Sequence, residues 1–178
     1  MEASGYVDAT LRIYARLLAA YTNSGICLQA YLHRTAADIE TLSQMKPTIR
    51  LVKGAYAQPP DVAIQSKVAI NANYLSLAQH LLREQVRGNV RRVAFATHDP
   101  MLIRHITDFA TAEGIARKEV EVQKLYGIRR AEQEQLALGG WRSGLLIAYG
   151  DYWYSWFVRR LAERPANLWL LVRNLVKD

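Results

Sequence analysis

Short runs of strand-forming residues alternate with helical patterns along this chain, and most runs end in glycine or polar residues. The runs cover residues 26–32, 49–56, 92–96, 120–125 and 145–148. Mostly apolar strands separated by helices are typical of parallel sheets that are covered on both faces. The order predicts an α/β protein, either a (β/α) barrel or a doubly wound sheet. About five strand–helix units do not supply the eight strands of a TIM barrel, so a barrel of this kind would be incomplete.

Helical patterns fill the intervals between these runs. They cover residues 7–18, 35–46, 64–86, 101–113 and 129–138, followed by a helix from residue 151 and an extra C-terminal helix over 166–176. Asp99 before Pro100 is expected to cap one helix, and Thr35 to Asp38 has the spacing of a capping box. The first helix has no strand before it, so we expect preceding strands to be missing. The 178 residues suit a single domain, residues 1–178.

The run over residues 49–56 carries two cations, Arg50 and Lys53, and breaks at Gly54. In α/β folds the chemistry lies where strands end. Residues three apart on an extended strand face opposite sides, so only a break near Gly54 would let both cations serve one ligand. The alternative is an edge strand whose two cations are solvated, and the run alone does not separate the two hypotheses.

The run over residues 26–32 is nearly continuous in apolar residues and holds Cys27 and Gln29. A buried amide needs a hydrogen-bond partner, which for Gln29 is either a ligand or neighbouring backbone. Cys27 is the only cysteine, which excludes an internal disulfide and a cysteine metal cluster. We expect it to be a buried structural thiol in a cytosolic protein.

His98 follows the third run and could donate a hydrogen bond to a ligand or anchor the loop. No nucleophile or second metal ligand lies near it in the sequence, and the other histidines add no metal-site spacing. We therefore expect no metal site. The chain also lacks a Gly-rich dinucleotide fingerprint and a P-loop, so any cofactor phosphates would be held by loops, helix ends and cationic side chains.

The chain is basic, with 23 Lys and Arg against 16 Asp and Glu, a net charge of +7 and a pI near 9.7. This charge favours phosphate-bearing ligands, nucleic acid or an anionic membrane surface. The basic residues are spread along the chain, so we expect no nucleic-acid partner. A function in binding nucleic acid or a membrane through this charge is therefore a weaker hypothesis than the two given below. No apolar run is long enough to span a membrane, and we expect a soluble, cytoplasmic protein.

Five segments together resemble the monofunctional proline dehydrogenases. They are Leu28–Leu32, Arg50–Tyr56, Phe95–His98, Leu125–Gly127 and Arg159–Arg164. The resemblance implies a distorted TIM barrel that binds FAD. It also implies oxidation of L-proline to 1-pyrroline-5-carboxylate, the first step of proline catabolism, with hydride transfer to the flavin and electrons passed to a quinone. Because that acceptor is lipid-soluble, peripheral contact with the inner membrane surface is an additional expectation.

The resemblance also implies a role for individual residues. Arg50 would be catalytic, lying near flavin N5 and tuning the flavin as reduction adds charge. The expected flavin-binding residues are Gln29, at the isoalloxazine edge, and Lys53, Gly54, Ala55, Thr97 and His98. The expected substrate-binding residues are Arg159 and Arg160, on the proline carboxylate, and Glu163, near the substrate amine.

The sequence departs from the family pattern at several places. The family has three earlier strands, Leu146 and Trp156 stand where it usually has tyrosines, and Asp99 stands where it often has asparagine. The second hypothesis is therefore a truncated or degenerate member without activity, a half-barrel that binds flavin, a small acid or a partner. A homo-oligomer or a separate N-terminal half would supply the missing strands.

Overall fold

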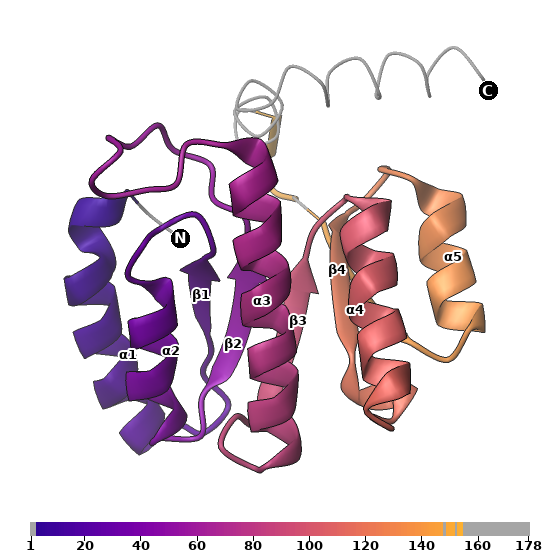
Figure 1. Cartoon of the computed structure of the whole chain (residues 1–178), viewed down its shortest axis with the longest axis horizontal. Helices are drawn as coiled ribbons and strands as arrows, with labels where there is room; N and C mark the ends of the chain where they lie inside the picture. The colour runs from indigo at the N-terminus through magenta and orange to yellow at the C-terminus, as the bar shows by residue number, and fades with distance from the viewer. Residues whose placement is uncertain (1–2, 148, 152, 155–178) are drawn as a thin grey trace.

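The computed structural model describes residues 3–147, 149–151 and 153–154, and its sheet has five parallel strands in the order β1-β2-β3-β4-β5 (Figure 1). The strands are β1 (Ile26–Gln29), β2 (Thr48–Val52), β3 (Arg92–Ala96), β4 (Glu121–Leu125) and β5 (Arg142–Leu146). The described helices are α1 (Val7–Ala20), α2 (Thr35–Ser43), α3 (Lys67–Val86), α4 (Pro100–Ala112) and α5 (Arg130–Leu138), with 3-10 turns at Ser4–Tyr6 and Arg117–Glu119.

The strand order decides between the two predicted architectures, a doubly wound sheet and a (β/α) barrel. In a doubly wound sheet the order reverses at a switch point, whereas these strands follow the chain without a reversal. Sequential parallel strands with a helix after each are the arrangement of a barrel segment. The α/β prediction is therefore confirmed, with five strands, while the predicted C-terminal helix over 166–176 lies outside the described residues.

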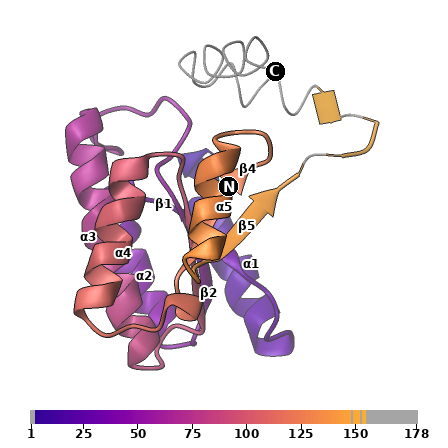
Figure 2. The same ribbon diagram turned by 90° about the vertical axis from the view of Figure 1, so that its right-hand side faces the viewer.

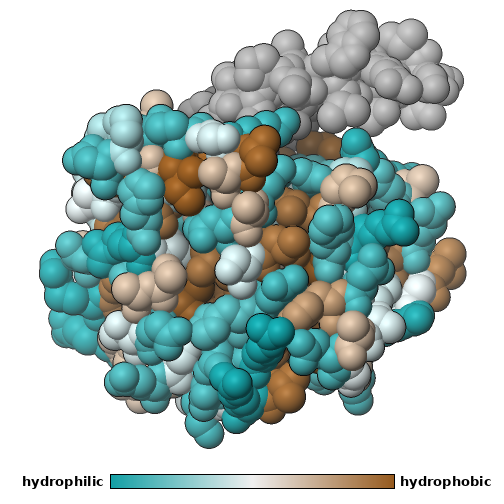
Figure 3. Space-filling view, viewed as in Figure 1, coloured by the Kyte–Doolittle hydropathy of each residue, from teal (hydrophilic) through white to brown (hydrophobic). Residues whose placement is uncertain are grey.

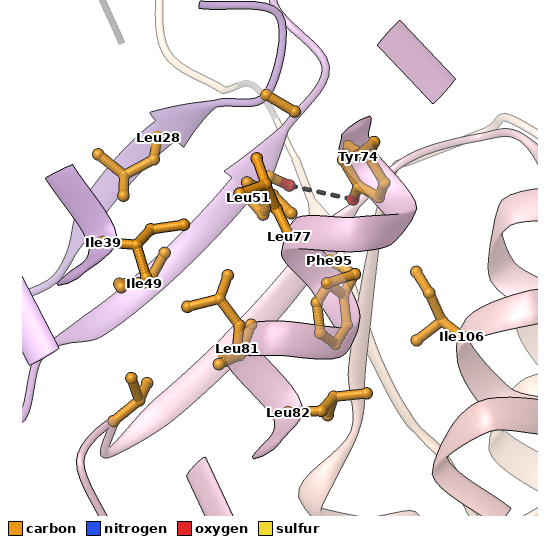
Figure 4. Close-up of a cluster of buried hydrophobic side chains, with 14 of the residues drawn as sticks. Leu28, Ile39, Ile49, Leu51, Tyr74, Leu77, Leu81, Leu82, Phe95 and Ile106 are labelled. Carbon is orange, nitrogen blue, oxygen red and sulfur yellow. Dashed lines mark hydrogen bonds between the residues drawn. The ribbon is translucent and has the colours of Figure 1, made fainter. Parts of the chain in front are cut away.

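The larger of two hydrophobic clusters lies between the sheet and the helices. Figure 4 shows Leu51 and Phe95 of the sheet against Tyr74 and Leu81 of α3. The fully buried Tyr74 hydroxyl donates to the Leu51 carbonyl oxygen at 3.2 Å, and burial raises the pKa of Tyr74 far above its usual value. Seen from the side, α3 and α4 lie together on one side of the strands (Figure 2). The outward surface of these helices is mainly hydrophilic (Figure 3).

Side chains alternate along each strand, so the residues between the core positions form the opposite face, which we call the inner face. Its members are Cys27, Gln29, Thr48, Arg50, Val52, Arg92, Ala94, Ala96, Glu121, Gln123, Leu125, Arg142, Gly144 and Leu146. Polar residues of all five strands thus share one face of the sheet.

Several predicted boundaries shift in the structure. The strand predicted over 26–32 ends at Gln29, and the one predicted over 145–148 begins at Arg142. The helix predicted from Ile64 begins at Lys67 because the Ile64 amide donates to the Tyr31 carbonyl at 2.8 Å, and Ser66 caps the helix.

The two predicted caps have opposite outcomes. Asp99 caps α4, accepting hydrogen bonds from the amides of Met101 and Leu102 at 3.1 and 3.5 Å, as predicted. The capping box at Thr35 is wrong, since the Thr35 hydroxyl donates instead to the Gln29 carbonyl at 2.5 Å. The chain therefore uses Thr35 to fix the end of β1.

Candidate active site

The carboxyl ends of β1, β2 and β3 place most of the predicted flavin-binding residues at one edge of the sheet. Gln29 pairs in register with Val52, and Val52 with Ala96, so Lys53 and Thr97 follow at neighbouring positions. Gln29, Lys53 and Thr97 are all buried. The structure thus brings together residues that are far apart in the sequence.

Arg50 lies on the inner face, and its guanidinium reaches across the sheet. Its Nε donates to Gln123 Oε1 at 2.7 Å, and its Nη1 contacts Cys27 Sγ at 3.6 Å. β2 pairs with strands on both sides, so the alternative of an edge strand with solvated cations is wrong. The guanidinium is held at the middle of a parallel sheet.

Cys27 departs from its predicted role as a buried core thiol. Its side chain is only partly buried and lies on the inner face beside Arg50, on the opposite side of β1 from Leu28. The apolar run around it predicted core packing, but side-chain alternation sends Leu28 to the core and Cys27 to the opposite face.

Lys53 forms an ion pair with Asp99 at 2.9 Å, and both side chains are largely buried. Burial would raise the pKa of Asp99, but the hydrogen bond and charge of Lys53, with the two α4 amides, outweigh it and hold that pKa below 3.8. The same carboxylate thus caps α4 and fixes the Lys53 ammonium at the end of β2.

Gly54 turns the chain immediately after Lys53. Its φ is +119°, and a Cβ added there would lie 2.2 Å from the Tyr31 ring. Glycine is therefore required by both the backbone and the neighbouring ring. The Tyr31 amide donates to the Lys53 carbonyl at 2.9 Å, and burial raises the pKa of the Tyr31 hydroxyl.

A cavity of about 290 Å³ lies beside this turn, and Gly54 and Ala55 form part of its wall. Its other lining residues are Tyr31, Tyr56, Ala57, Gln58, Ile64, Gln65 and Ile70. The lining combines aromatic, aliphatic and amide side chains and carries no formal charge.

Thr97 and His98 form the loop between β3 and α4. The Thr97 hydroxyl accepts a hydrogen bond from the Asp99 amide at 3.1 Å, which shapes the turn that presents Asp99. Thr97 is buried and His98 is half-buried. Thr97 therefore supports the carboxylate that holds Lys53.

Sequence reasoning missed a polar network on β4. Gln123 Nε2 donates to Glu121 Oε1 at 2.7 Å, and Glu121 Oε2 accepts from Arg92 at 2.6 Å to Nη2 and 2.8 Å to Nε. Arg142 lies farther from the same carboxylate, at 3.9 Å. The alternation of Glu121 and Gln123 with Val120 and Val122 was the available signal.

The predicted substrate-binding residues Arg159, Arg160 and Glu163 lie outside the described residues, as does Trp156. Leu146, the other departure from the family pattern, is on the inner face at the end of β5 and is 42% exposed.

Across the described ranges, no cluster of three or more His, Cys, Asp or Glu side chains could hold a metal ion. None of the helices in that part is long and apolar enough to cross a membrane.

This chain is similar in sequence to known proteins of one family. The family model for proline dehydrogenase matches residues 1–169. The chain is 40% identical over 180 residues to a proline dehydrogenase of Deinococcus radiodurans, covering 99% of this chain and 56% of the relative. It is 37% identical over 177 residues to proline dehydrogenase 1 of Bacillus subtilis strain 168, covering 99% of this chain and 57% of the relative. The chain thus spans a little over half the length of the relatives it matches.

Solved structures agree with the barrel-type fold. Proline utilization A from Bdellovibrio bacteriovorus, inactivated by N-propargylglycine, superposes with a TM-score of 0.80 at 26% identity, over 90% of this chain and 19% of that one. Proline utilization A from Corynebacterium freiburgense matches in fold, with a TM-score of 0.76 at 24% identity over 98% of this chain and 21% of that one.

Proposed function

This chain belongs to the proline dehydrogenase family, and we propose that it carries the flavin-binding half of an enzyme that oxidises L-proline to 1-pyrroline-5-carboxylate. The observation that carries the proposal is the placement of Arg50 at the centre of a parallel sheet, with Gln29 and Lys53 at the adjoining strand ends. Strand carboxyl ends are where barrel enzymes place their active sites.

The donor set of this site fits FAD. A flavin ring presents carbonyl oxygens and ring nitrogens that accept hydrogen bonds, and its phosphates are anionic. The chain offers a guanidinium at Arg50, an amide at Gln29 and an ammonium at Lys53. FAD, when bound, would accept the hydride from proline. Gly54, Ala55, Thr97 and His98 are proposed to complete the cofactor site.

Arg50 is proposed to act electrostatically. A fixed guanidinium stabilises negative charge that develops nearby during a reaction, and it does so most strongly where water is excluded. Its hydrogen bond to Gln123 orients the group before any ligand arrives. This preorganisation supports a catalytic role for Arg50.

Arg159, Arg160 and Glu163 are proposed to bind the substrate, on the strength of the family resemblance. Two arginines can hold a carboxylate through charge-assisted hydrogen bonds, each worth about 1.5–3 kcal/mol. Glu163 would accept a hydrogen bond from the proline amine. A quinone acceptor and contact with the inner membrane surface complete the proposal as predictions from the same resemblance.

A half-barrel without turnover is the second candidate function. Leu146 on the inner face favours it, because leucine cannot donate the hydrogen bond that a tyrosine hydroxyl would give. Such a protein would bind flavin, a small acid or a partner chain. A second copy or a separate chain with the remaining strands is the predicted partner.

The test measures flavin binding and proline oxidation in the purified protein. We expect FAD to bind with a visible flavin spectrum that proline bleaches without oxygen, and Arg50→Lys to slow this bleaching about 100-fold. Arg104→Lys is the matched control, since Arg104 is exposed on α4 and pairs only loosely with Asp108 at 3.6 Å. Bound flavin that proline never bleaches would favour the half-barrel, and failure to bind FAD would reject the cofactor site.

A further inference from the structure

We propose that Gln123 and Glu121 form a relay that fixes the orientation of the Arg50 guanidinium on the inner face. The catalytic consequence of this relay rests on the function proposed above. The relay itself rests on contacts within this chain, so it can be tested without substrate or flavin.

Each hydrogen bond of the relay is donated in the same direction, from Arg50 toward Glu121. Arg50 Nε donates to Gln123 Oε1 at 2.7 Å, and Gln123 Nε2 donates to Glu121 Oε1 at 2.7 Å. An ionised carboxylate only accepts hydrogen bonds and a guanidinium only donates them. The Gln123 amide must therefore turn its NH2 group to Glu121 and its oxygen to Arg50, because the flipped amide would lose both bonds.

The far end of the relay is anchored by an ion pair. Glu121 is 4% exposed, and its second oxygen, Oε2, accepts from Arg92 at 2.6 and 2.8 Å. A buried carboxylate with charged and amide donors on both oxygens has little freedom to rotate. Glu121 is thus a fixed point from which Gln123 is aligned.

The neighbouring strands leave room for the relay. Strands lie about 4.8 Å apart, so Arg50 on β2 must cross β3 to reach Gln123 on β4, a span of roughly 10 Å. At the positions of β3 between them, that face carries the small side chains of Ala94 and Ala96. On the other side, a Cβ at Gly144 would lie 3.0 Å from Gln123 Cγ and 3.2 Å from Glu121 Oε1.

The relay gives Gln123 and Glu121 a role as positioning residues. With Nε bound to Gln123, the plane of the Arg50 guanidinium is set, and its Nη1 is directed to Cys27 on β1. A long arginine side chain loses substantial rotamer freedom when ordered, and here the protein has ordered it before ligand binding. Loss of the relay should therefore weaken the action of Arg50 on a bound flavin.

The test begins with the Arg50 Nε–H signal in a nitrogen–proton NMR spectrum, assigned by its absence in Arg50→Lys. We expect this proton to exchange with water slowly in the wild type and at least tenfold faster in Gln123→Met. Gln85→Met is the control, because Gln85 donates to the Glu119 carbonyl, away from the inner face. Unchanged exchange in Gln123→Met would overturn the relay.

The second readout is the midpoint potential of bound FAD. We expect Gln123→Met to lower the ratio of affinities for reduced and oxidised flavin about tenfold, equivalent to about 30 mV for a two-electron couple. We also expect kcat to fall while KM changes little. Fast exchange with an unchanged potential would overturn the positioning role, whereas wild-type protein that never oxidises proline would overturn the proposed function and leave the exchange result valid.

A second variant keeps the test valid if Gln123→Met fails to fold. Gln123→Asn keeps the amide but is one methylene shorter, so it cannot span the two 2.7 Å bonds. We expect it to fold and to show the same faster exchange of the Arg50 proton. Wild-type exchange in a folded Gln123→Asn protein would contradict the proposal.

Discussion

Substituting alanine for Gly54 should destabilise the protein by about 2–6 kcal/mol, the sum of a backbone term and a packing term. The backbone at Gly54 has a φ of +119°, where an L side chain stores about 1–3 kcal/mol of strain. The added Cβ would also meet the Tyr31 ring at 2.2 Å, and overpacking of this kind costs about 1–3 kcal/mol. These two terms act at the same atom, so they should combine nearly in full.

Gly88→Ala is the matched control for this substitution. Gly88 also has a positive φ, +80°, but a Cβ there would find nothing within 4 Å. It should show only backbone strain, partly offset by the reduced entropy of the unfolded chain, for a net loss of about 1 kcal/mol. The difference between the two alanine variants therefore isolates the contact with Tyr31.

Urea unfolding followed by circular dichroism measures both losses. Gly54→Ala should have a clearly lower midpoint than Gly88→Ala at a similar slope. Truncating the ring with Tyr31→Ala should bring the added cost of Gly54→Ala to within about 1 kcal/mol of the Gly88→Ala cost. Equal midpoints for the two alanine variants would refute the argument that Tyr31 packs against the turn.

Two further substitutions test the buried polar contacts. Asp99→Asn should lower the free energy of unfolding by about 1 kcal/mol at pH 7, because it removes the charge that pairs with Lys53. The hydrogen bond and charge of Lys53 hold the folded pKa of Asp99 below its usual value, so this stability is present above the usual pKa and is lost as pH falls through the folded pKa. The urea midpoints of wild type and variant should therefore converge in acid, and equal midpoints at pH 7 would contradict the pairing. Asp108→Asn, on an exposed and loose pair, is the control and should change little. Tyr74→Phe should cost about 1 kcal/mol in the same assay through loss of the bond to the Leu51 carbonyl, and a neutral effect would contradict that bond.

The parts of the fold that follow local rules could be predicted from the sequence. The cap at Asp99 depends on an acceptor placed before Pro100, and both signals lie within a few residues. The parallel sheet followed from apolar runs that alternate with helices. The start of α3 could not be found this way, because the Ile64 amide is committed to Tyr31, a residue 33 positions earlier.

The side-chain contacts of the candidate site likewise depend on residues that are far apart in the sequence. Sequence reasoning predicted that Arg50 and Lys53 leave the strand on opposite sides, and their partners do lie in different places, Gln123 on β4 and Asp99 before α4. Neither partner could be assigned beforehand, since each pairing depends on strand register. Glu121 likewise gave no sign that it is buried until the register placed it between Arg92 and Gln123.

The composition of the inner face explains how charged residues can lie there together. A buried arginine or glutamate is unfavourable unless its hydrogen bonds are satisfied. Here two of the charged side chains, Arg50 and Glu121, are joined through the neutral amide of Gln123, and small residues on the flanking strands keep the path between them clear. A larger residue in place of Ala94 would therefore act like loss of Gln123, by separating Arg50 from its anchor without removing either charge. We expect Ala94→Leu to speed exchange of the Arg50 Nε proton as Gln123→Met does, and slow exchange in a folded Ala94→Leu protein would show that Arg50 reaches β4 by another path.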